Sequence, residues 1–247
     1  MAKTNNWIFL RGLTRGKGHW GYFPEQFKKY FPDAQIEFLD LPGNGDRHAE
    51  LSPLHMRDYV EDLRLHSQLL KQGPVNLFSI SLGSMIAVSW QDLYPQDIGT
   101  TVLINTSYRG IAPWKRFNLA AMAYFARVPM VKSAWMKEDL ISRVVCNNDE
   151  NRKKSLPLLV EQTSRSPFQV QNFFRQIYAA AMANFPQKNR SEVILFASEK
   201  DRLVSPLCTR KIAQIWDVPV FYHPTAGHDL PIDDPEWILN NMKSVFK

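Results

Sequence analysis

Short runs of apolar residues alternate along the chain with longer stretches in which apolar residues recur at helical spacing. The short runs predict buried strands, at about 7–10, 35–39, 75–78, 100–105, 193–197 and 220–222. The longer stretches predict helices, at about 19–31, 53–71, 82–94, 206–215 and 235–245. Ser52-Pro53 has the form of a cap followed by proline at the first helical position, so Ser52 is expected to cap the second of these helices. Strands that alternate with helices favour a parallel sheet with right-handed crossovers, so the predicted fold class is α/β.

The alternation stops in the middle of the chain. Residues 109–189 follow a helical pattern broken by five prolines, and no run there predicts a strand. We interpret this block as a helical insertion that leaves a core of residues 1–108 and 190–247. Open α/β sheets bind ligands at the carboxyl ends of their strands, and the insertion is placed to cover those ends as a cap.

Length and composition narrow the class of protein. A chain of 247 residues with 45% hydrophobic and 12% aromatic residues has enough apolar material for one large core. The amino terminus leads into only four apolar residues, too few for a secretion signal, and no stretch is long enough to span a membrane. Cys146 and Cys208 lack the spacing of a metal site, so we expect free thiols in a cytoplasmic protein without a bound metal.

The sequence Ser79-Ile80-Ser81-Leu82-Gly83 lies between a predicted strand and a predicted helix. This is the layout of a nucleophile elbow, a strained turn that pushes one Ser hydroxyl into the open. Small residues two positions before and after that Ser let the two arms approach closely, and Ser79 and Gly83 meet this need. Ser81 is therefore the candidate nucleophile. The alternative interpretation is a Ser-rich turn that caps the helix.

Two later strands end beside the residue types that would complete such a site. Asp201 follows the strand at 193–197, and His228 follows the strand at 220–222. Parallel strands bring their carboxyl ends to one edge of the sheet, which is also the edge that carries Ser81. The chain order Ser, Asp, His is that of a nucleophile, its orienting acid and its base on this kind of sheet.

Neighbouring residues compete for two of these roles. Glu199 and Asp229 are rival acids, but Asp229 adjoins His228 in sequence and would have difficulty turning back onto its ring. His223 lies at a strand end and fits a structural role better. His228 is preferred because a glycine that we expect to be mobile precedes it and a helix follows. The other histidines precede Ser81 and do not fit the order.

A different motif competes for the amino-terminal loop. Residues 16–21 match G-x-G-x-x-G, and Asp40 ends a predicted strand further on, as in a dinucleotide-binding fingerprint. That fingerprint turns directly off its strand, whereas five residues separate Leu10 from Gly16. A phosphate loop also fails, because Gly18 stands where Ser or Thr is needed. We therefore expect no cofactor and interpret the glycines as part of a loop of backbone N–H donors.

Taken together, these motifs resemble the α/β-hydrolase family, in its small esterase-like branch with a helical cap. Four stretches carry the resemblance: Arg11-Gly12-Leu13 with Trp20, residues 40–45, residues 79–83, and residues 201–204 with 227–228. The chain departs from the family pattern at Arg11, where His is usual, at Ser79, where Gly is usual, and at Asp46-Arg47.

The resemblance implies an oxyanion hole made by the backbone N–H groups of Leu82 and Leu13. It also implies that Gly12 and Trp20 lie at the substrate, and we add Arg109 because it follows the strand end at 100–105. The expected activity is cleavage of a carboxylic ester or thioester through an acyl-serine intermediate. The partner is then a small molecule, with neither nucleic acid nor a membrane span involved.

Three other functions stay open at this point. The same residues would also serve a lyase or a C–C hydrolase with the same fold, because the residues of the site, and not the fold, determine the reaction. A catalytically silent member that binds a ligand is the third. The complete Ser–Asp–His set disfavours the silent alternative, since a binding module has no need of all three.

Charge is distributed unevenly. The formal charge of the chain is +6, but residues 109–190 alone carry a net +9. If these residues roof the site, cations such as Arg109, Lys115, Arg116 and Arg165 would attract a substrate that bears a carboxylate or phosphate. Otherwise they belong to the solvated faces of helices, above a neutral pocket of Phe, Met and Leu side chains.

Overall fold

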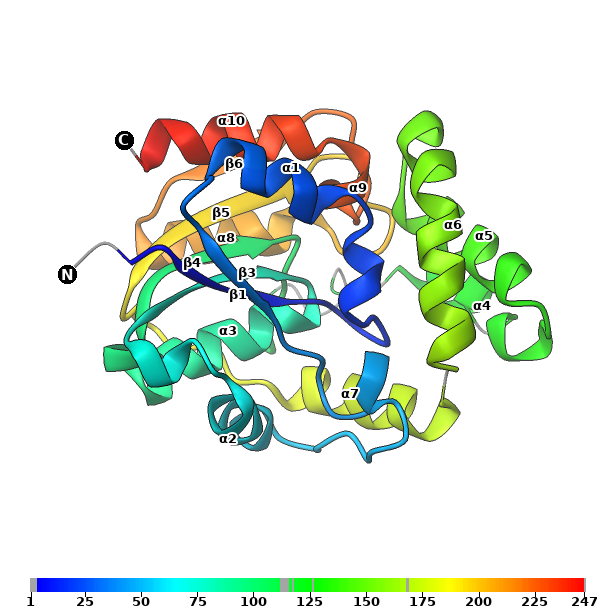
Figure 1. The fold of residues 1–247 in the computed structure, drawn as a ribbon, viewed down its shortest axis with the longest axis horizontal. Helices are drawn as coiled ribbons and strands as arrows, with labels where there is room; N and C mark the ends of the chain where they lie inside the picture. Colours follow the sequence, from blue (N-terminus) through cyan, green and yellow to red (C-terminus); the bar gives the residue numbers. More distant parts are fainter. Residues whose placement is uncertain (1–3, 112–115, 117, 126, 168, 247) are drawn as a thin grey trace.

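The computed structural model of this protein describes residues 4–111, 116, 118–125, 127–167 and 169–246. Its centre is a six-stranded sheet in which every neighbouring pair is parallel, in the order β2-β1-β3-β4-β5-β6 (Figure 1). The strands are β1 (Asn6–Leu10), β2 (Gln35–Phe38), β3 (Val75–Ile80), β4 (Ile98–Ile104), β5 (Glu192–Ser198) and β6 (Val220–His223). The predicted α/β class and all six predicted strands are confirmed.

Helices cover both faces of the sheet and bury two separate apolar clusters. One cluster contains residues of α2 (Met56–His66), α3 (Leu82–Leu93) and α8 (Pro206–Trp216). The other contains residues of α1 (Phe23–Tyr30) and α10 (Pro235–Val245). Strand side chains alternate between the faces, so β1 sends Ile8 and Leu10 to the first cluster and Trp7 and Phe9 to the second.

Aromatic rings fix the strands that lead to the site. Phe78 stacks on Phe9 and Phe23 with ring centroids 4.8 and 4.9 Å apart, and Trp20 meets Phe9 edge-on at 5.2 Å. Such pairs contribute about 0.5–1.5 kcal/mol each beyond their buried area. They hold β1 and β3 side by side just below the carboxyl ends from which the chain turns into the site.

The first predicted helix is divided in two. A 3-10 helix at Lys17–Trp20 ends at Gly21, whose φ of 55° is left-handed, and α1 begins only at Phe23. Glycine is favoured at position 21 because residues with a Cβ rarely adopt such a φ. The expectation of one helix over 19–31 was therefore wrong at this break.

The helix expected at 53–71 is shorter than predicted, since α2 spans Met56–His66 and a 3-10 helix follows at Leu70–Gln72. Ser52, expected to cap it, instead donates its hydroxyl to the carbonyl oxygen of Pro42 at 2.8 Å and its N–H to Asn172 Oδ1 at 2.9 Å. The side chain that looked like a local cap thus makes long-range contacts. Further 3-10 helices lie at Gly45–Arg47 and Pro95–Asp97.

Between β4 and β5 the described residues form helices and no strand. They are α4 (Leu119–Phe125), a 3-10 helix at Val128–Met130, α5 (Ala134–Val145), α6 (Asp149–Arg165) and α7 (Val170–Met182). In Figure 1 α4, α5 and α6 stand beyond one edge of the core, while α7 runs back beneath it. A short helix, α9 (Leu230–Asp233), joins β6 to α10. None of the described helices combines the length and apolarity needed to cross a bilayer.

Candidate active site

Ser81 occupies a strained turn between β3 and α3. Its φ of 58° and ψ of −119° are disfavoured for a residue with a Cβ, and such strain is concentrated at functional sites. A Cβ on Gly83 would lie 2.4 Å from the carbonyl oxygen of Leu10, so only glycine allows α3 to approach β1 this closely. Ser79 is buried and donates to the carbonyl oxygen of Val102 at 2.8 Å. The turn therefore has the geometry of a nucleophile elbow with Ser81 at its tip.

The loop after β1 packs directly on this turn. A Cβ on Gly12 would lie 3.0 Å from Ser81 Cβ, which explains a glycine there. Thr14, with a φ of 57°, donates its N–H to Gln176 Oε1 at 2.9 Å and so fixes the loop to α7. Among the described residues, the N–H groups of Leu13 and Leu82 have no protein acceptor. Two backbone donors beside Ser81 are thus available to a ligand.

His228 is bound to Asp201. His228 Nδ1 and Asp201 Oδ2 are 2.7 Å apart, and the Asp201 side chain is only 1% exposed. The second carboxylate oxygen, Oδ1, accepts the N–H groups of Leu203 at 2.7 Å and Val204 at 2.9 Å. These bonds orient the carboxylate, which in turn holds the imidazole. No described residue is bonded to Nε2, so this nitrogen is available to act on another group.

The rival acids have other partners. Asp229 makes a two-pronged ion pair with Arg11, with distances of 3.0 and 2.6 Å, and both side chains are 5% exposed. Glu199 is paired at the surface with Arg210 at 3.3 Å. The contact with His228 is thus made by Asp201, the residue selected from the sequence.

The glycine before His228 has a different role from the one expected. Gly227 was interpreted as a source of mobility, but a Cβ there would lie 2.6 Å from the carbonyl oxygen of Val145. Its N–H also donates to Asp233 Oδ2 at 2.6 Å. Gly227 is required because the His228 loop passes close to the end of α5.

Asn105 is a residue of this site that the sequence analysis missed. It follows β4 with a φ of 47°, and its amide donates to the carbonyl oxygen of His228 at 2.8 Å. Its Oδ1 accepts the N–H of Ser198 at 2.8 Å. Asn105 thereby ties the His228 loop to the ends of two central strands. An Asn as the last residue of a predicted strand is the only local signal, because Asn tolerates a left-handed φ.

A cavity of about 370 Å³ lies over Ser81 and His228. Its floor, as we call the part contributed by the core, includes Gly12, Leu13, Ser81 and His228. Its roof, contributed by the helices between β4 and β5, is apolar and includes Phe125, Val128, Ile141, Val145, Phe173 and Phe174. The polar side chains of Ser81 and His228 therefore lie on the floor, whereas the roof offers apolar contact.

The structure does not bring every expected substrate-binding residue to this cavity. Gly12 lines it, but Trp20 is buried beneath Arg11, whose guanidinium carbon lies 4.7 Å from the Trp20 ring centroid. Arg109 is exposed and is not among the described residues that line the cavity. The expectations for Trp20 and Arg109 therefore find no support.

Other cations of residues 109–190 have partners or positions away from the cavity. Arg116 is buried and donates to the carbonyl oxygen of Ala180 at 2.7 Å. Arg165 is 73% exposed and pairs with Glu161. Lys115 lies outside the described residues. The described cations among those expected to attract an anion thus have structural or surface positions.

Two arginines do line the cavity, and both have carboxylate partners. Arg11 is paired with Asp229, as above, and Arg15 makes a two-pronged ion pair with Glu138 of α5 at 2.7 and 2.9 Å. Burial alone would raise the pKa of Glu138, but Arg15 lowers it well below its usual range. Burial and Arg15 lower the pKa of His19 to about 4, so His19 is neutral beside Glu138 at pH 7.

The amides of the glycine-rich loop are used within the protein. Gly16 N–H donates to His19 Nδ1 at 2.9 Å, Lys17 N–H to Asp40 Oδ1 at 2.6 Å, and Gly18 N–H to Gln162 Oε1 at 3.0 Å. These donors are therefore not free to bind phosphate. Among the described residues, no group of three or more His, Cys, Asp or Glu side chains is placed to hold a metal ion.

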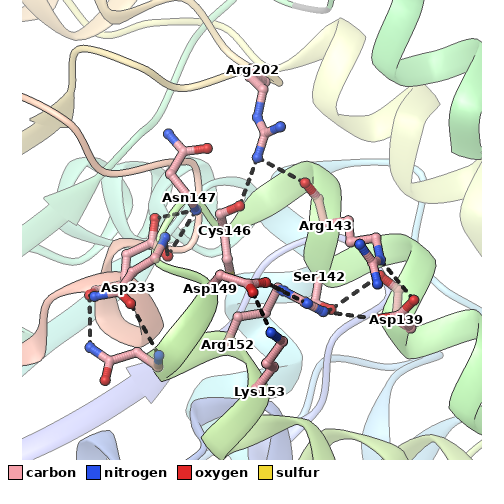
Figure 2. Close-up of polar contacts among 12 residues, drawn as sticks. Asp139, Ser142, Arg143, Cys146, Asn147, Asp149, Arg152, Lys153, Arg202 and Asp233 are labelled. Atoms are coloured by element: carbon pink, nitrogen blue, oxygen red, sulfur yellow. Dashed lines mark hydrogen bonds and ion pairs between the residues drawn. The ribbon is translucent and has the colours of Figure 1, made fainter.

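The turn from α5 to α6, residues 146–148, is bonded to the His228 loop through Asp233. The Asp233 carboxylate accepts the N–H group of Asn147 at 2.8 Å (Figure 2). It also accepts the N–H group of Asn148 at 3.0 Å and, as noted, that of Gly227. The Asn147 amide also donates to the carbonyl oxygen of Thr225 at 2.9 Å. We call this turn the α5–α6 corner.

The same corner is bonded to the loop that carries Asp201. Arg202 Nη2 donates to the carbonyl oxygens of Arg143 at 2.8 Å and Cys146 at 2.7 Å, as Figure 2 shows. The Asp229 N–H donates to the carbonyl oxygen of Val145 at 2.8 Å. The roof is thus fixed to both the Asp201 loop and the His228 loop.

A model of the alpha/beta hydrolase family matches residues 7–240 of the chain. The chain belongs to the alpha/beta hydrolase family. This confirms the resemblance seen in the sequence. A putative 2-succinyl-6-hydroxy-2,4-cyclohexadiene-1-carboxylate synthase of Bacillus subtilis (strain 168) is 30% identical over 105 residues, which are 40% of this chain and 36% of that protein. The match therefore spans about a third of that relative's length.

Solved alpha/beta hydrolases share the whole fold. A fold member from Chitinophaga pinensis has a TM-score of 0.79 at 13% identity, over 100% of this chain and 90% of that one. A meta-cleavage product hydrolase from Pseudomonas fluorescens IP01 has 0.75 at 14%, over 100% and 92%. A thermophilic esterase from Thermogutta terrifontis has 0.70 at 16%, over 100% and 90%. At these identities the likeness shows the fold alone.

Proposed function

We propose that this alpha/beta hydrolase is a serine hydrolase that cleaves carboxylic esters or thioesters through an acyl-Ser81 intermediate. One observation carries the proposal: Ser81, at a strained elbow, shares a cavity with His228, which is bonded to the buried Asp201. A nucleophile, a base and an orienting acid in this relation are what acyl transfer requires.

In this mechanism His228 accepts the Ser81 proton as the hydroxyl attacks the acyl carbon. Asp201 holds the imidazole tautomer and stabilises the imidazolium that forms. The N–H groups of Leu82 and Leu13 stabilise the oxyanion, and one such donor is worth about 3 kcal/mol of barrier. His228 then protonates the leaving alcohol or thiol, and a water molecule, activated by His228 in turn, releases the acid from Ser81.

The cavity supports a neutral acyl group rather than the anionic one that the charge pattern offered as an alternative. The roof is apolar, and the two arginines at the cavity are paired with Asp229 and Glu138. At about 30 Å³ for each water displaced, 370 Å³ accommodates on the order of a dozen heavy atoms. Esters of medium, uncharged acyl chains are therefore the substrates that we favour.

A lyase or C–C hydrolase is the second candidate. The matched Bacillus subtilis relative is named a synthase, and one structural neighbour is a meta-cleavage product hydrolase. In such an enzyme Ser81 and His228 would serve as a proton-abstracting pair. Ester turnover then would be absent or slow, although Ser81 could still be activated.

A fluorophosphonate probe with a panel of 4-nitrophenyl esters tests the proposal. We expect the probe to label Ser81 and the esters to be hydrolysed fastest at medium chain length. Labelling without ester turnover would favour the second candidate. Neither labelling nor turnover would leave a silent ligand-binding member.

A further inference from the structure

Arg11 and Asp229 sit on either side of the groups to which the proposed function assigns the chemistry. Arg11 directly precedes Gly12 and Leu13, and Asp229 directly follows His228. Their ion pair joins two loops that are 218 residues apart in sequence, and both side chains line the cavity. One buried contact thus links the loop with the Leu13 donor to the loop with the base.

The geometry of the Arg11–Asp229 pair fixes the relative orientation of the two side chains as well as balancing their charges. Arg11 Nη1 meets Asp229 Oδ1 at 3.0 Å and Nη2 meets Oδ2 at 2.6 Å, the two parallel bonds that only a guanidinium makes with a carboxylate. The guanidinium also lies 4.7 Å from the Trp20 ring centroid. A buried ion pair is a poor source of stability compared with apolar residues of the same size, so its presence calls for another reason.

The balance of charge around His228 offers a reason for this buried ion pair. Among the described residues, the charged groups at or next to the cavity are Asp201, which is bonded to His228, and the pairs Arg11–Asp229 and Arg15–Glu138. Asp233 and Arg202 lie beside the two loops, where Asp233 accepts backbone N–H groups and Arg202 donates to backbone carbonyl oxygens. Each arginine that lines the cavity is matched by one carboxylate. Removing one member of the Arg11–Asp229 pair would leave a single uncompensated charge at the cavity that His228 also lines.

We propose that Arg11 and Asp229 are positioning residues that hold the His228 loop against the Leu13 loop and keep the charge beside His228 balanced. The proposal rests on the proposed function, because its effect is read through His228 as the base. Neither residue touches the reacting atoms; they act through the residues next to them in the chain.

The two members of the pair make opposite predictions for pH dependence. In Arg11→Met the unpaired Asp229 carboxylate favours the imidazolium, so the acidic limb of kcat/KM moves to higher pH. In Asp229→Asn the unpaired Arg11 disfavours the imidazolium, and the limb moves to lower pH. Each shift is about 0.5–1 pH unit for a charge at this range in a partly screened site. In the double variant the two effects cancel and the midpoint returns close to that of the wild type.

The experiment measures kcat and KM for 4-nitrophenyl butyrate against pH in the wild type, both single variants and the double variant. The exposed pair Glu199–Arg210 is the matched control, and Glu199→Gln and Arg210→Met should leave the midpoint unchanged. Opposite shifts that cancel support the proposal. Shifts in the same direction, or none, overturn it, because a purely structural loss would not depend on the sign of the remaining charge.

A conservative variant covers failure to fold, which circular dichroism would detect. Arg11→Lys keeps the charge and loses the two-pronged geometry, so we expect the wild-type midpoint with kcat at least about tenfold lower. Unchanged kcat in Arg11→Lys would overturn the positioning role. If the wild type itself lacks Ser81-dependent ester turnover, the proposed function fails first, and that result is distinct from an active wild type whose variants do not shift.

Discussion

The floor and the roof of the cavity are built in opposite ways. On the floor, polar groups are placed by backbone geometry and strand ends: Ser81 by its left-handed φ, Asp201 by two N–H donors, and His228 by Asp201 and Asn105. On the roof, apolar side chains come from several helices. Under the proposed function, the floor would determine whether a reaction occurs and the roof would determine which acyl group is accepted.

The two parts are nevertheless tied together at one place. The α5–α6 corner is bonded to the loops of both Asp201 and His228, through Arg202 and Asp233 (Figure 2). Changes there should affect the floor even though the corner belongs to the roof. Floor variants should therefore lower kcat, roof variants should alter chain-length preference, and corner variants should lower kcat and stability together.

The largest effect is expected from Ser81→Ala. Loss of the nucleophile should lower kcat for 4-nitrophenyl butyrate by about 10⁵–10⁶-fold, while the fold is kept because the hydroxyl faces the cavity. Ser79→Ala is the matched control two residues away and should be mild, since it removes only the hydroxyl bonds to the Val102 carbonyl oxygen and to Ser84 Oγ. An inactive Ser79→Ala together with an active Ser81→Ala would show that Ser81 is not the nucleophile and that the register of the elbow is wrong.

Asp201→Asn should come next, with kcat lower by about 10⁴-fold because the amide no longer holds the productive imidazole tautomer. Glu199→Gln, in the same loop but at the surface, should change kcat less than about twofold. The reverse ranking of these two variants would move the acid two residues upstream.

Asp233→Ala tests the link between roof and floor. The change leaves three backbone N–H groups without their acceptor, which should cost about 1–3 kcal/mol of unfolding free energy for the buried groups that find no water. Because one of these N–H groups precedes His228, kcat should also fall about tenfold. Thermal unfolding and kcat are measured in parallel. Lower stability with unchanged kcat would show that the corner does not support the base.

Roof variants should move specificity. Phe173→Ala widens the cavity, so the preferred acyl chain should lengthen while kcat for short esters changes by less than about tenfold, as one pocket contact is worth about 1–3 kcal/mol of discrimination. Kinetics on a series of 4-nitrophenyl esters measure this. A uniform loss at every chain length would contradict a specificity role for the roof.

The smallest effect concerns pH and stability at the contact between Arg15 and α5. The pKa of His19 is lowered to about 4, whereas an unfolded histidine titrates near about 6.5. As pH falls between these values the unfolded chain takes up a proton that the folded chain does not, so the stability present above about 6.5 is progressively lost. At pH 5 the loss is about 2 kcal/mol. His19→Gln should remove it, and its melting temperature should fall less between pH 7 and 5 than that of the wild type.

The fold and the proposed chemical residues were predictable because each has a local pattern. Alternating apolar runs identify the strands, and the elbow is defined by five consecutive residues. The order Ser81, Asp201, His228 follows from where strands end. Because parallel strands bring their carboxyl ends to one edge of the sheet, residues that follow different strands can be predicted to lie close together from their sequence positions alone.

What the sequence did not predict depends on long-range contacts. Asn105, Asp233 and the Arg11–Asp229 pair have partners that no spacing rule identifies, and 218 residues separate the members of that pair. Ser52 looked like a helix cap because a local bond was assumed, but tertiary partners took its hydroxyl. The charge pattern left an anionic and a neutral substrate open for the same reason, since side-chain partners decide whether a cation is available to a substrate.

The most direct test of the central claim is to trap the acyl-enzyme. We would mix the protein with 4-nitrophenyl butyrate, quench in acid within milliseconds, and map the modified peptide by mass spectrometry. The account predicts a butyryl group on Ser81, present in Ser79→Ala and absent in Ser81→Ala. Turnover of the ester with no acyl group on Ser81, or with the group on another residue, would contradict it.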